Sequence, residues 1–224
     1  TYVAWHQLTA TYGSPSLNPE SDIDSQTPGF IVVAYGKMGG IELGYQSDLD
    51  LVFLHNALAS NQTDGERQID NSTFYMRLGQ RIIHLLSTPT PSGIAYEIDM
   101  RLRPSGSSGM LVSTLAAFKK YQQRDAWTWE KQALVRSRVV TGDSNLAADY
   151  SRVRETVLRQ SRDTQSLANE VQQMREKIRK HLGQNTKDGK FSLKQGYGGI
   201  VDIEFMVQFA VLAWSHTHPL LSRW

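Results

Sequence analysis

The pattern of hydrophobic and polar positions changes between the two halves of the chain. Residues 30–35 form an unbroken apolar run rich in β-branched side chains, and residues 49–55 form a second apolar run, so both predict strands buried on two faces. Residues 94–104 alternate between charged and apolar positions, which predicts a third strand with one polar face. Apolar residues recur at helical spacing over residues 70–86. The first half is therefore predicted to combine strands and helices.

After Ser113, which can cap a helix, the pattern becomes mainly helical. Helices are expected over residues 113–123, 126–138, 144–181 and 199–216, and short strands over residues 110–112 and 191–194. We predict an α+β fold in which a domain with a mixed sheet and flanking helices covers residues 1–142 and a helical region covers residues 143–224. Because the chain starts at Thr1 and ends at Trp224 just after a predicted helix, we interpret it as a fragment truncated at its C-terminus.

Composition narrows the classes of protein that fit this pattern. The chain has 224 residues, 24 Lys and Arg, 22 Asp and Glu, and no cysteine. Without cysteine there is no disulfide, thiolate nucleophile or cysteine zinc site, which agrees with a cytoplasmic location. A net charge of +2 is too balanced for a surface that coats nucleic acid, and no apolar run is long enough to cross a membrane. Any phosphate chemistry must come from a local site.

The strongest chemical signal follows the first predicted strand. Gly39 and Gly40 belong to a glycine-rich turn, where the backbone can approach a phosphate closely. Asp48 and Asp50 open the next strand and project from the same face, because side chains alternate along a strand. Two such carboxylates repel each other and raise each other's pKa, but they suit a hard cation. The pattern predicts a magnesium site beside a phosphate-binding turn.

A third carboxylate would complete a site for two metal ions. Asp99 on the third predicted strand is the first candidate, and Glu97 on the same face is the alternative. Arg101 and Arg103 follow on that face, within reach of a polyphosphate. Alone, the paired aspartates fit a strand end and the alternating charges fit a ladder of salt bridges. Together with the glycine turn, they favour metal-dependent nucleotidyl transfer.

Four sequence motifs resemble the glutamine synthetase adenylyltransferase family, whose enzymes contain two nucleotidyltransferase halves of the DNA polymerase β type. In chain order they are GKMGGIELGYQSDLDLVFLH, YEIDMRLRPSGSSGMLV, WEKQALVRSRVVTGD and KQGYGGIVDIEF, within about residues 30–210. The resemblance implies an enzyme of nitrogen metabolism that uses ATP and two Mg²⁺ ions and modifies glutamine synthetase. It also implies regulation by glutamine and the PII signalling protein, and no nucleic-acid or membrane partner.

The resemblance also implies roles for individual residues. The residues it places on ATP are Gly39, Gly40, Ser47, Arg101, Arg103 and Lys194, and the catalytic, magnesium-binding residues are Asp48, Asp50 and Asp99. At the start of the last predicted helix, Asp202 and Glu204 either complement the helix dipole or close over the nucleotide.

Two further sets of residues have mainly structural interpretations. Trp127, Trp129 and Glu130 are interpreted as core residues at the junction between the two halves of the fragment. Arg136 and Arg138 could reach phosphate but are interpreted as surface charges.

The wording of the motifs favours the C-terminal half of the family's enzymes, which adds AMP to a tyrosine. YGKMGG, SDLDLVF, SGMLV and AWTWEKQALVRSRVV resemble that half more than the other, whose counterparts read SDIDLIF and carry a proline after the second glycine of the SG pair. Two alternatives stay open: the half that removes AMP by phosphorolysis, and a nucleotide-binding module without turnover.

Overall fold

The structure is a computed structural model that describes residues 1–22, 24–58, 61–94, 96–182 and 192–223. The chain divides into two compact units. Unit 1 comprises Thr1–Asp125 and Arg136–Val153, and unit 2 comprises Ala126–Val135 and Arg154–Trp224. The predicted domain boundary after residue 142 stays a prediction, because a compact unit is not by itself an independently folding domain.

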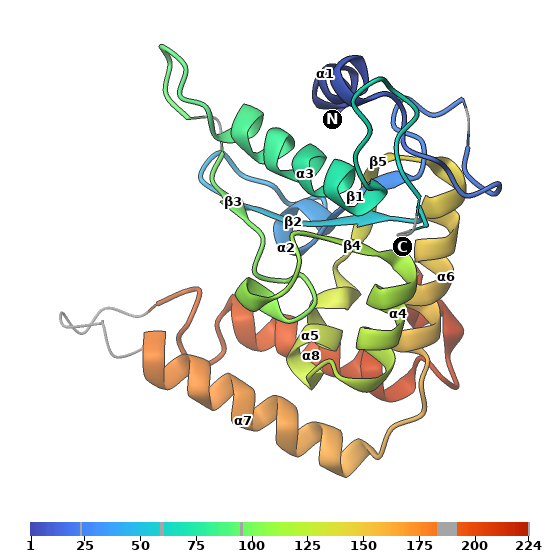
Figure 1. The fold of residues 1–224 in the computed structure, drawn as a ribbon. Coiled ribbons are helices and arrows are strands. Elements are labelled where there is room, and N and C mark those ends of the chain that lie inside the picture. The colour runs from blue at the N-terminus through green and yellow to red at the C-terminus, as the bar shows by residue number, and fades with distance from the viewer. Residues whose placement is uncertain (23, 59–60, 95, 183–191, 224) are drawn as a thin grey trace. The chain divides into compact units, whose positions relative to one another are not determined.

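Unit 1 is built on a five-stranded mixed sheet (Figure 1). Its strands are β1 (Phe30–Ala34), β2 (Leu49–His55), β3 (Ile98–Asp99), β4 (Val112–Thr114) and β5 (Arg138–Gly142). β1 pairs antiparallel with β2 on one side and β5 on the other, while β3 and β4 both pair parallel with β2. The α+β class with a mixed sheet is confirmed, as are the two predicted buried strands.

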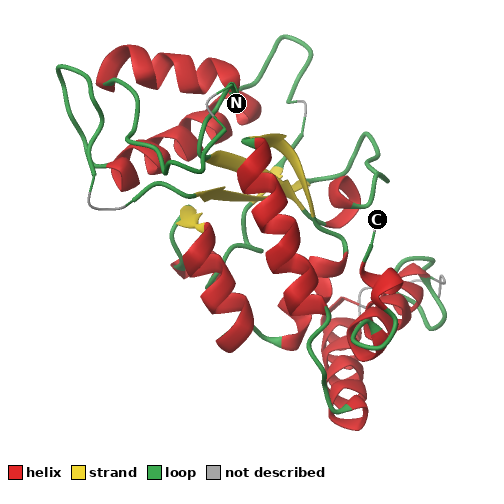
Figure 2. Ribbon diagram, turned by 90° about the vertical axis from the view of Figure 1, so that its right-hand side faces the viewer, coloured by secondary structure: helices red, strands yellow, loops and turns green. Residues whose placement is uncertain are grey.

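The helices of unit 1 lie on both sides of this sheet, with α1 and α3 together on one side (Figures 1 and 2). They are α1 (Tyr2–Tyr12), α2 (Gly36–Gly39), α3 (Asn71–Ser87), α4 (Leu115–Arg124) and the first part of α6 (Ser144–Leu158). The Trp5 ring of α1 packs edge-on against Phe74 of α3, with ring centroids 5.4 Å apart, and both side chains belong to the buried core that these helices share with the strands. The helix predicted over residues 70–86 is thus confirmed as α3. This core fixes β2, the strand that carries Asp50.

The strand predicted over residues 94–104 is wrong for most of its length. Among the described residues of this range, Ile98–Asp99 alone forms a strand, which pairs with β2, and the chain then turns. Arg103 stabilises the turn, because its guanidinium donates to the carbonyl oxygens of Met100, Ser107 and Gly109 at 2.7, 3.1 and 3.3 Å. Arg103 therefore does not continue a charged strand face after Asp99.

The helix predicted over residues 126–138 is too long. The observed helix, α5, spans only Thr128–Val135. After two residues the chain forms β5, in which Val139 lies opposite Val33 of β1. The β-branched side chains of this segment suit a strand, and pairing with β1 supplies its hydrogen bonds. Because of this strand, Arg138 at the start of β5 and Arg136 just before it lie beside the glycine turn.

Unit 2 is helical, as predicted. It contains α5, the end of α6, α7 (Thr164–Leu182), α8 (Ile200–Trp214) and η3 (Pro219–Ser222). The buried Arg154 donates to the carbonyl oxygens of Leu134, Val135 and Ser222 at 3.0, 2.7 and 2.7 Å, which ties the end of α5 to η3. Residues 192–194 form no strand, and residue 191 lies outside the described part of the chain.

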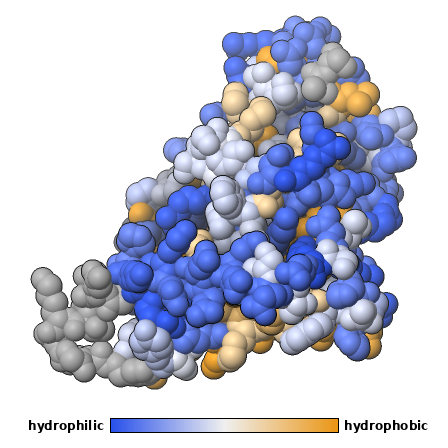
Figure 3. All heavy atoms as spheres, turned by 90° about the horizontal axis from the view of Figure 1, so that it is seen from below, coloured by the Kyte–Doolittle hydropathy of each residue, from blue (hydrophilic) through white to orange (hydrophobic). Residues whose placement is uncertain are grey.

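The molecular face drawn in Figure 3 is mostly hydrophilic, with smaller hydrophobic patches. Among the described helices, none has the length and apolar character needed to cross a membrane.

His55, at the end of β2, makes the stability of the protein depend on pH. It is 3% exposed, stacks on Tyr75 with ring centroids 4.4 Å apart, and burial lowers its pKa to about 4. In the unfolded chain the imidazole of His55 takes up a proton near pH 6.5, whereas in the folded protein it does so only near pH 4. Protonation therefore favours the unfolded chain, and the free energy of unfolding falls as the pH drops from 6.5 towards 4. The difference in pKa corresponds to roughly 3 kcal/mol.

We expect His55→Phe to lose less stability between pH 7 and pH 4 than the wild type, measured by urea unfolding. His84→Gln, at an exposed position of α3, serves as the control and should behave as the wild type. An equal loss of stability in His55→Phe and the wild type would contradict this account.

Candidate active site

The predicted carboxylates gather where β2 begins. Asp50 lies directly opposite Asp99 in the parallel pairing of β2 with β3, so the two side chains are neighbours on one face of the sheet. Asp48 directly precedes β2 and is exposed, whereas Asp50 and Asp99 are partly buried. Glu97 is exposed, and its carbonyl oxygen accepts from the backbone N–H of Leu49 at 2.8 Å. The register therefore places Asp99, rather than Glu97, beside Asp50.

Asp50 carries the electrostatic signature of a crowded anionic site. Its pKa is raised, first by burial and then by the negative charges of Asp99 and Asp48. The positive charges of Arg101 and Arg136 act in the opposite direction but do not cancel these effects. An additional cation at this position would therefore relieve a repulsion that the fold itself creates.

Arg101 supplies the positive charge next to Asp99. Its backbone N–H and Nε donate to Asp99 Oδ1 at 2.8 and 3.0 Å, and its guanidinium also forms an ion pair with Oδ2. This interaction holds the pKa of Asp99 below its usual range. The Arg101 side chain is otherwise 77% exposed, so it is free to move away without disturbing a core.

The carboxylates suit magnesium in their chemistry, because oxygen ligands from a few carboxylates are what Mg²⁺ takes in proteins. Gly36 leaves Asp50 uncovered: a Cβ atom there would lie 2.5 Å from Asp50 Oδ2. Within the described ranges, however, no group of three His, Asp or Glu side chains lies close enough to hold a metal ion. Magnesium binding stays a prediction.

The glycine pair is packed against Arg136. A Cβ atom on Gly39 would lie 2.0 Å from the Arg136 carbonyl oxygen, and one on Gly40 would lie 2.9 Å from Arg136 Nη2. Arg136 Nη2 donates to Glu42 Oε2 at 2.6 Å, and Arg138 Nε donates to the Gly39 carbonyl oxygen at 3.1 Å. Close packing against Arg136 thus leaves little room for a side chain at positions 39 and 40, in addition to the predicted role of both glycines with ATP.

Arg136 and Arg138 are not free surface charges, so that interpretation is wrong. The Arg136 side chain is only 17% exposed, and Arg138 caps the carbonyl oxygens at the end of α2. The sequence did carry a signal: the arginines alternate in RSRVV, directly before a β-branched run, which is typical of a strand.

Ser47 and Lys37 complete the turn. Ser47 is buried, and its hydroxyl oxygen accepts from the Gly44 N–H at 3.1 Å and from Lys37 Nζ at 3.4 Å. Ser47 therefore closes the loop before β2, and its role with ATP stays a prediction. Lys37, to which the sequence analysis assigns no role, adds an ammonium group to the glycine turn.

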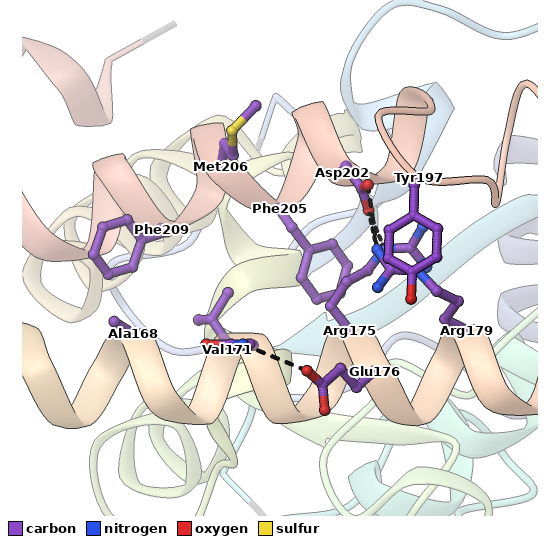
Figure 4. A pocket seen from close by; sticks show the side chains of 11 residues that line it. Ala168, Val171, Arg175, Glu176, Arg179, Tyr197, Asp202, Phe205, Met206 and Phe209 are labelled. Carbon is purple, nitrogen blue, oxygen red and sulfur yellow. Dashed lines mark hydrogen bonds and ion pairs between the residues drawn. The ribbon is translucent and has the colours of Figure 1, made fainter.

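The residues predicted from the last motif lie in unit 2. Lys194 is exposed in the turn before α8, and its role with ATP stays a prediction. Asp202 accepts from Arg175 Nε at 2.5 Å, Gly198 N–H at 2.7 Å and Arg179 Nη2 at 3.0 Å, and the bond from Arg175 is the main cause of its lowered pKa. Figure 4 shows this cluster at one end of a cavity of about 550 Å³ between α7 and α8. The ion pairs of Asp202 with Arg175 and Arg179 therefore join α8 to α7 within unit 2.

The aromatic residues before α5 differ in part from their interpretation. Trp127 is 71% exposed, so the interpretation of this tryptophan as a core residue is wrong, whereas Glu130 is only 5% exposed.

Two comparisons with known proteins identify the family of this chain. The family model described as glutamate-ammonia ligase adenylyltransferase matches residues 1–153. The bifunctional glutamine synthetase adenylyltransferase/adenylyl-removing enzyme of Pseudomonas putida is 54% identical over 233 aligned positions, which cover 99% of this chain and 24% of that protein. The chain thus spans about a quarter of the length of this relative. It belongs to the glutamate-ammonia ligase adenylyltransferase family of nucleotidyltransferases.

Proposed function

We propose that this chain transfers AMP from ATP to a tyrosine of glutamine synthetase and releases pyrophosphate. The observation that carries the proposal is the register of Asp50 with Asp99, which sets two carboxylates side by side, next to the glycine turn. The name of the Pseudomonas putida relative covers both addition and removal of the adenylyl group. The direction of the reaction therefore rests on the motifs, which resemble the adenylylating half.

In the proposed reaction, the tyrosine hydroxyl oxygen forms a bond to the α-phosphorus of ATP. The bond from that phosphorus to the bridging oxygen of the β-phosphate breaks, pyrophosphate leaves with the electron pair, and the hydroxyl proton is lost to solvent. Magnesium held by Asp48, Asp50 and Asp99 would offset the charge of the triphosphate and favour loss of that proton. Positioning and charge neutralisation would supply most of the acceleration.

The cationic side chains of unit 1 would bind the triphosphate. Lys37 Nζ donates to Ser47 Oγ at 3.4 Å, and the Arg136 guanidinium occupies the space that a Cβ atom on Gly40 would need. Arg101 pairs with Asp99 and is placed to exchange that carboxylate for a phosphate oxygen. Arg103 would first have to release three backbone carbonyl oxygens, so we expect it to act mainly by shaping the turn.

The wider properties implied by the resemblance belong to the same proposal. They are a polymerase β-like fold, a cytoplasmic location, a role in nitrogen assimilation, and regulation by glutamine and the PII protein. Their common support is membership of the family.

The test of direction compares two reactions. Unmodified glutamine synthetase with ATP and Mg²⁺ should gain AMP and release pyrophosphate. Adenylylated glutamine synthetase with phosphate should release little or no ADP. If only the second reaction runs, the chain is the deadenylylating half; if ATP binds and neither runs, it is a binding module.

We expect Arg136→Gln to raise the KM for ATP about tenfold to a hundredfold, because a hydrogen bond to a charged group contributes about 1.5–3 kcal/mol. The measurement is the initial rate of AMP transfer at saturating glutamine synthetase. Arg152→Gln replaces an arginine of unit 1 whose side chain is 75% exposed and serves as the control. Glu42→Gln removes the partner of Arg136 but keeps the guanidinium, so its KM should change less. An unchanged KM in Arg136→Gln would mean that Arg136 serves packing alone.

A further inference from the structure

Arg138 binds the backbone of the protein itself, beside the candidate active site. It begins β5, where it lies opposite Ala34 of β1. Its Nε donates to the Gly39 carbonyl oxygen at 3.1 Å, and its Nη2 donates to the Met38 carbonyl oxygen at 3.2 Å. Nothing in the proposed transfer of AMP accounts for these two bonds.

The fold itself aims the Arg138 side chain at α2. Ser137, the residue before β5, is fully buried, and its hydroxyl is hydrogen-bonded to that of Tyr150 in α6 at 2.7 Å. Because successive side chains of an extended segment point to opposite sides, Arg138 points away from Ser137. The guanidinium is thus in place before any substrate binds.

α2 depends on such contacts for its form. It is a single helical turn, Gly36–Gly39, and an isolated turn is unfavourable because nucleation of a helix is costly. Arg138 adds two hydrogen bonds and a positive charge at the C-terminal end of α2, where the helix dipole is negative. Arg138 therefore stabilises the observed position of this turn.

The backbone directly after α2 is strained at Ile41. Its φ is 60°, which is unfavourable for a β-branched residue. The residue is 75% exposed, so burial of its side chain does not compensate the strain. The backbone N–H of Glu42 donates to the Lys37 carbonyl oxygen at 2.8 Å and closes the segment. Loss of the Arg138 bonds would therefore allow residues 36–42 to relax.

The first residue of α2 lies against the candidate catalytic carboxylate. A Cβ atom on Gly36 would lie 2.5 Å from Asp50 Oδ2, and the N–H of Tyr35 donates to the Asp50 carbonyl oxygen at 2.9 Å. Because α2 is only one turn long, a displacement at Met38 and Gly39 would also displace the backbone that faces Asp50. A misplacement of about 1 Å can lower a rate by about a hundredfold.

We propose that Arg138 is a positioning residue for AMP transfer. It holds the strained residues 36–42 in place and thereby sets the position of the nucleotide, bound at the glycine turn, relative to Asp50. The inference rests on the proposed function. Arg138 acts through the backbone of α2 rather than on the nucleotide, because two of its three nitrogens already donate to carbonyl oxygens.

The first test measures the rate of AMP transfer. We expect Arg138→Gln to lower kcat/KM for ATP about tenfold to a hundredfold, with part of the loss in kcat, and to leave the KM for glutamine synthetase unchanged. Arg138→Lys keeps the charge and should recover part of the rate. Arg159→Gln is the control and should match the wild type, since Arg159 has a side chain only 29% exposed that donates to Ser222 Oγ at 2.9 Å within unit 2.

The second test combines Arg138→Gln with Ile41→Asn. Asparagine accepts a positive φ more readily than isoleucine, so Ile41→Asn removes strain. Arg138→Gln should therefore reduce the rate less in the Ile41→Asn background than in the wild type. In urea unfolding, which needs no substrate, Ile41→Asn should stabilise the wild type more than it stabilises Arg138→Gln, where the strain has already relaxed.

Three results would overturn the proposal: an unchanged kcat/KM for ATP in folded Arg138→Gln, additive effects of Arg138→Gln and Ile41→Asn, or a rise in the KM for ATP with unchanged kcat. The last result would mean that Arg138 contacts the nucleotide directly. An active wild type with any of these results leaves the proposed function intact. A wild type that transfers no AMP overturns the proposed function, and coupling of the two substitutions in stability would then show that the Arg138 bonds serve the fold alone.

Discussion

We expect Asp50→Asn to remove nearly all AMP transfer and to leave the fold at least as stable as the wild type. The substitution keeps the size of the side chain and removes a negative charge that the proposed magnesium ion requires. We expect the rate to fall about a hundredfold to a thousandfold, because single electrostatic contacts at a reacting centre are worth about 10²–10³. The measurement is the initial rate of AMP transfer, together with thermal unfolding of the same preparation.

The direction of the stability change follows from the raised pKa of Asp50. Its ionised form is disfavoured in the folded protein by burial and by Asp99 and Asp48, so it destabilises the fold at pH values above its unfolded pKa. Asparagine removes that effect, and the gain should be present at pH 7 and shrink in acid, where Asp50 is protonated. Glu66→Gln, at an exposed position of unit 1, is the control. A large fall in Tm, or transfer near the wild-type rate, would contradict the catalytic role.

Gly39→Ala should destabilise the protein far more than Gly40→Ala. A Cβ atom on Gly39 would lie 2.0 Å from the carbonyl oxygen of Arg136 and 2.8 Å from that of Ala34. Both are backbone atoms: Ala34 pairs with Arg138 of β5, and Arg136 lies two residues before β5, so neither can shift as easily as a side chain. We expect a loss above the 1–3 kcal/mol that ordinary overpacking costs, measured by urea unfolding.

In Gly40→Ala the new Cβ atom meets flexible side chains rather than backbone, because it would lie 2.9 Å from Arg136 Nη2 and 3.1 Å from Glu42 Oε1. The guanidinium can shift, so the fold should remain while the KM for ATP rises. Equal stability of Gly39→Ala and Gly40→Ala would show that the backbone contact at Gly39 is not needed. A stable Gly40→Ala with unchanged KM would argue against phosphate binding by this turn.

The elements predicted correctly from the sequence are those whose pattern is local. The apolar runs of β1 and β2 and the helical spacing of α3 reflect burial of their own side chains. β5 was missed because its strand character depends on pairing with β1, more than a hundred residues earlier, as the Val33–Val139 pair shows. The predicted strand is too long after Asp99. Alternating charges predict an extended chain, but they do not reveal that Arg103 donates to the carbonyl oxygen of Met100 and thereby stabilises a turn.

The candidate site was predictable to a similar degree. Spacing predicts Asp48 and Asp50 on one face of a strand, whereas in the structure β2 begins at Leu49, directly after Asp48. The register of β2 with β3 then selects Asp99 as the neighbour of Asp50. The contact of Arg136 with Glu42 joins positions 94 residues apart, which no local pattern reveals. The pairing of Arg101 with Asp99 likewise follows from the turn after β3.

The most direct test of the account is the intact mass of unmodified glutamine synthetase after incubation with this chain, ATP and Mg²⁺. The account predicts a gain of one AMP per subunit, and no gain when Asp50→Asn replaces the wild type. An unchanged mass with folded wild-type chain, or the same gain with Asp50→Asn, would contradict it.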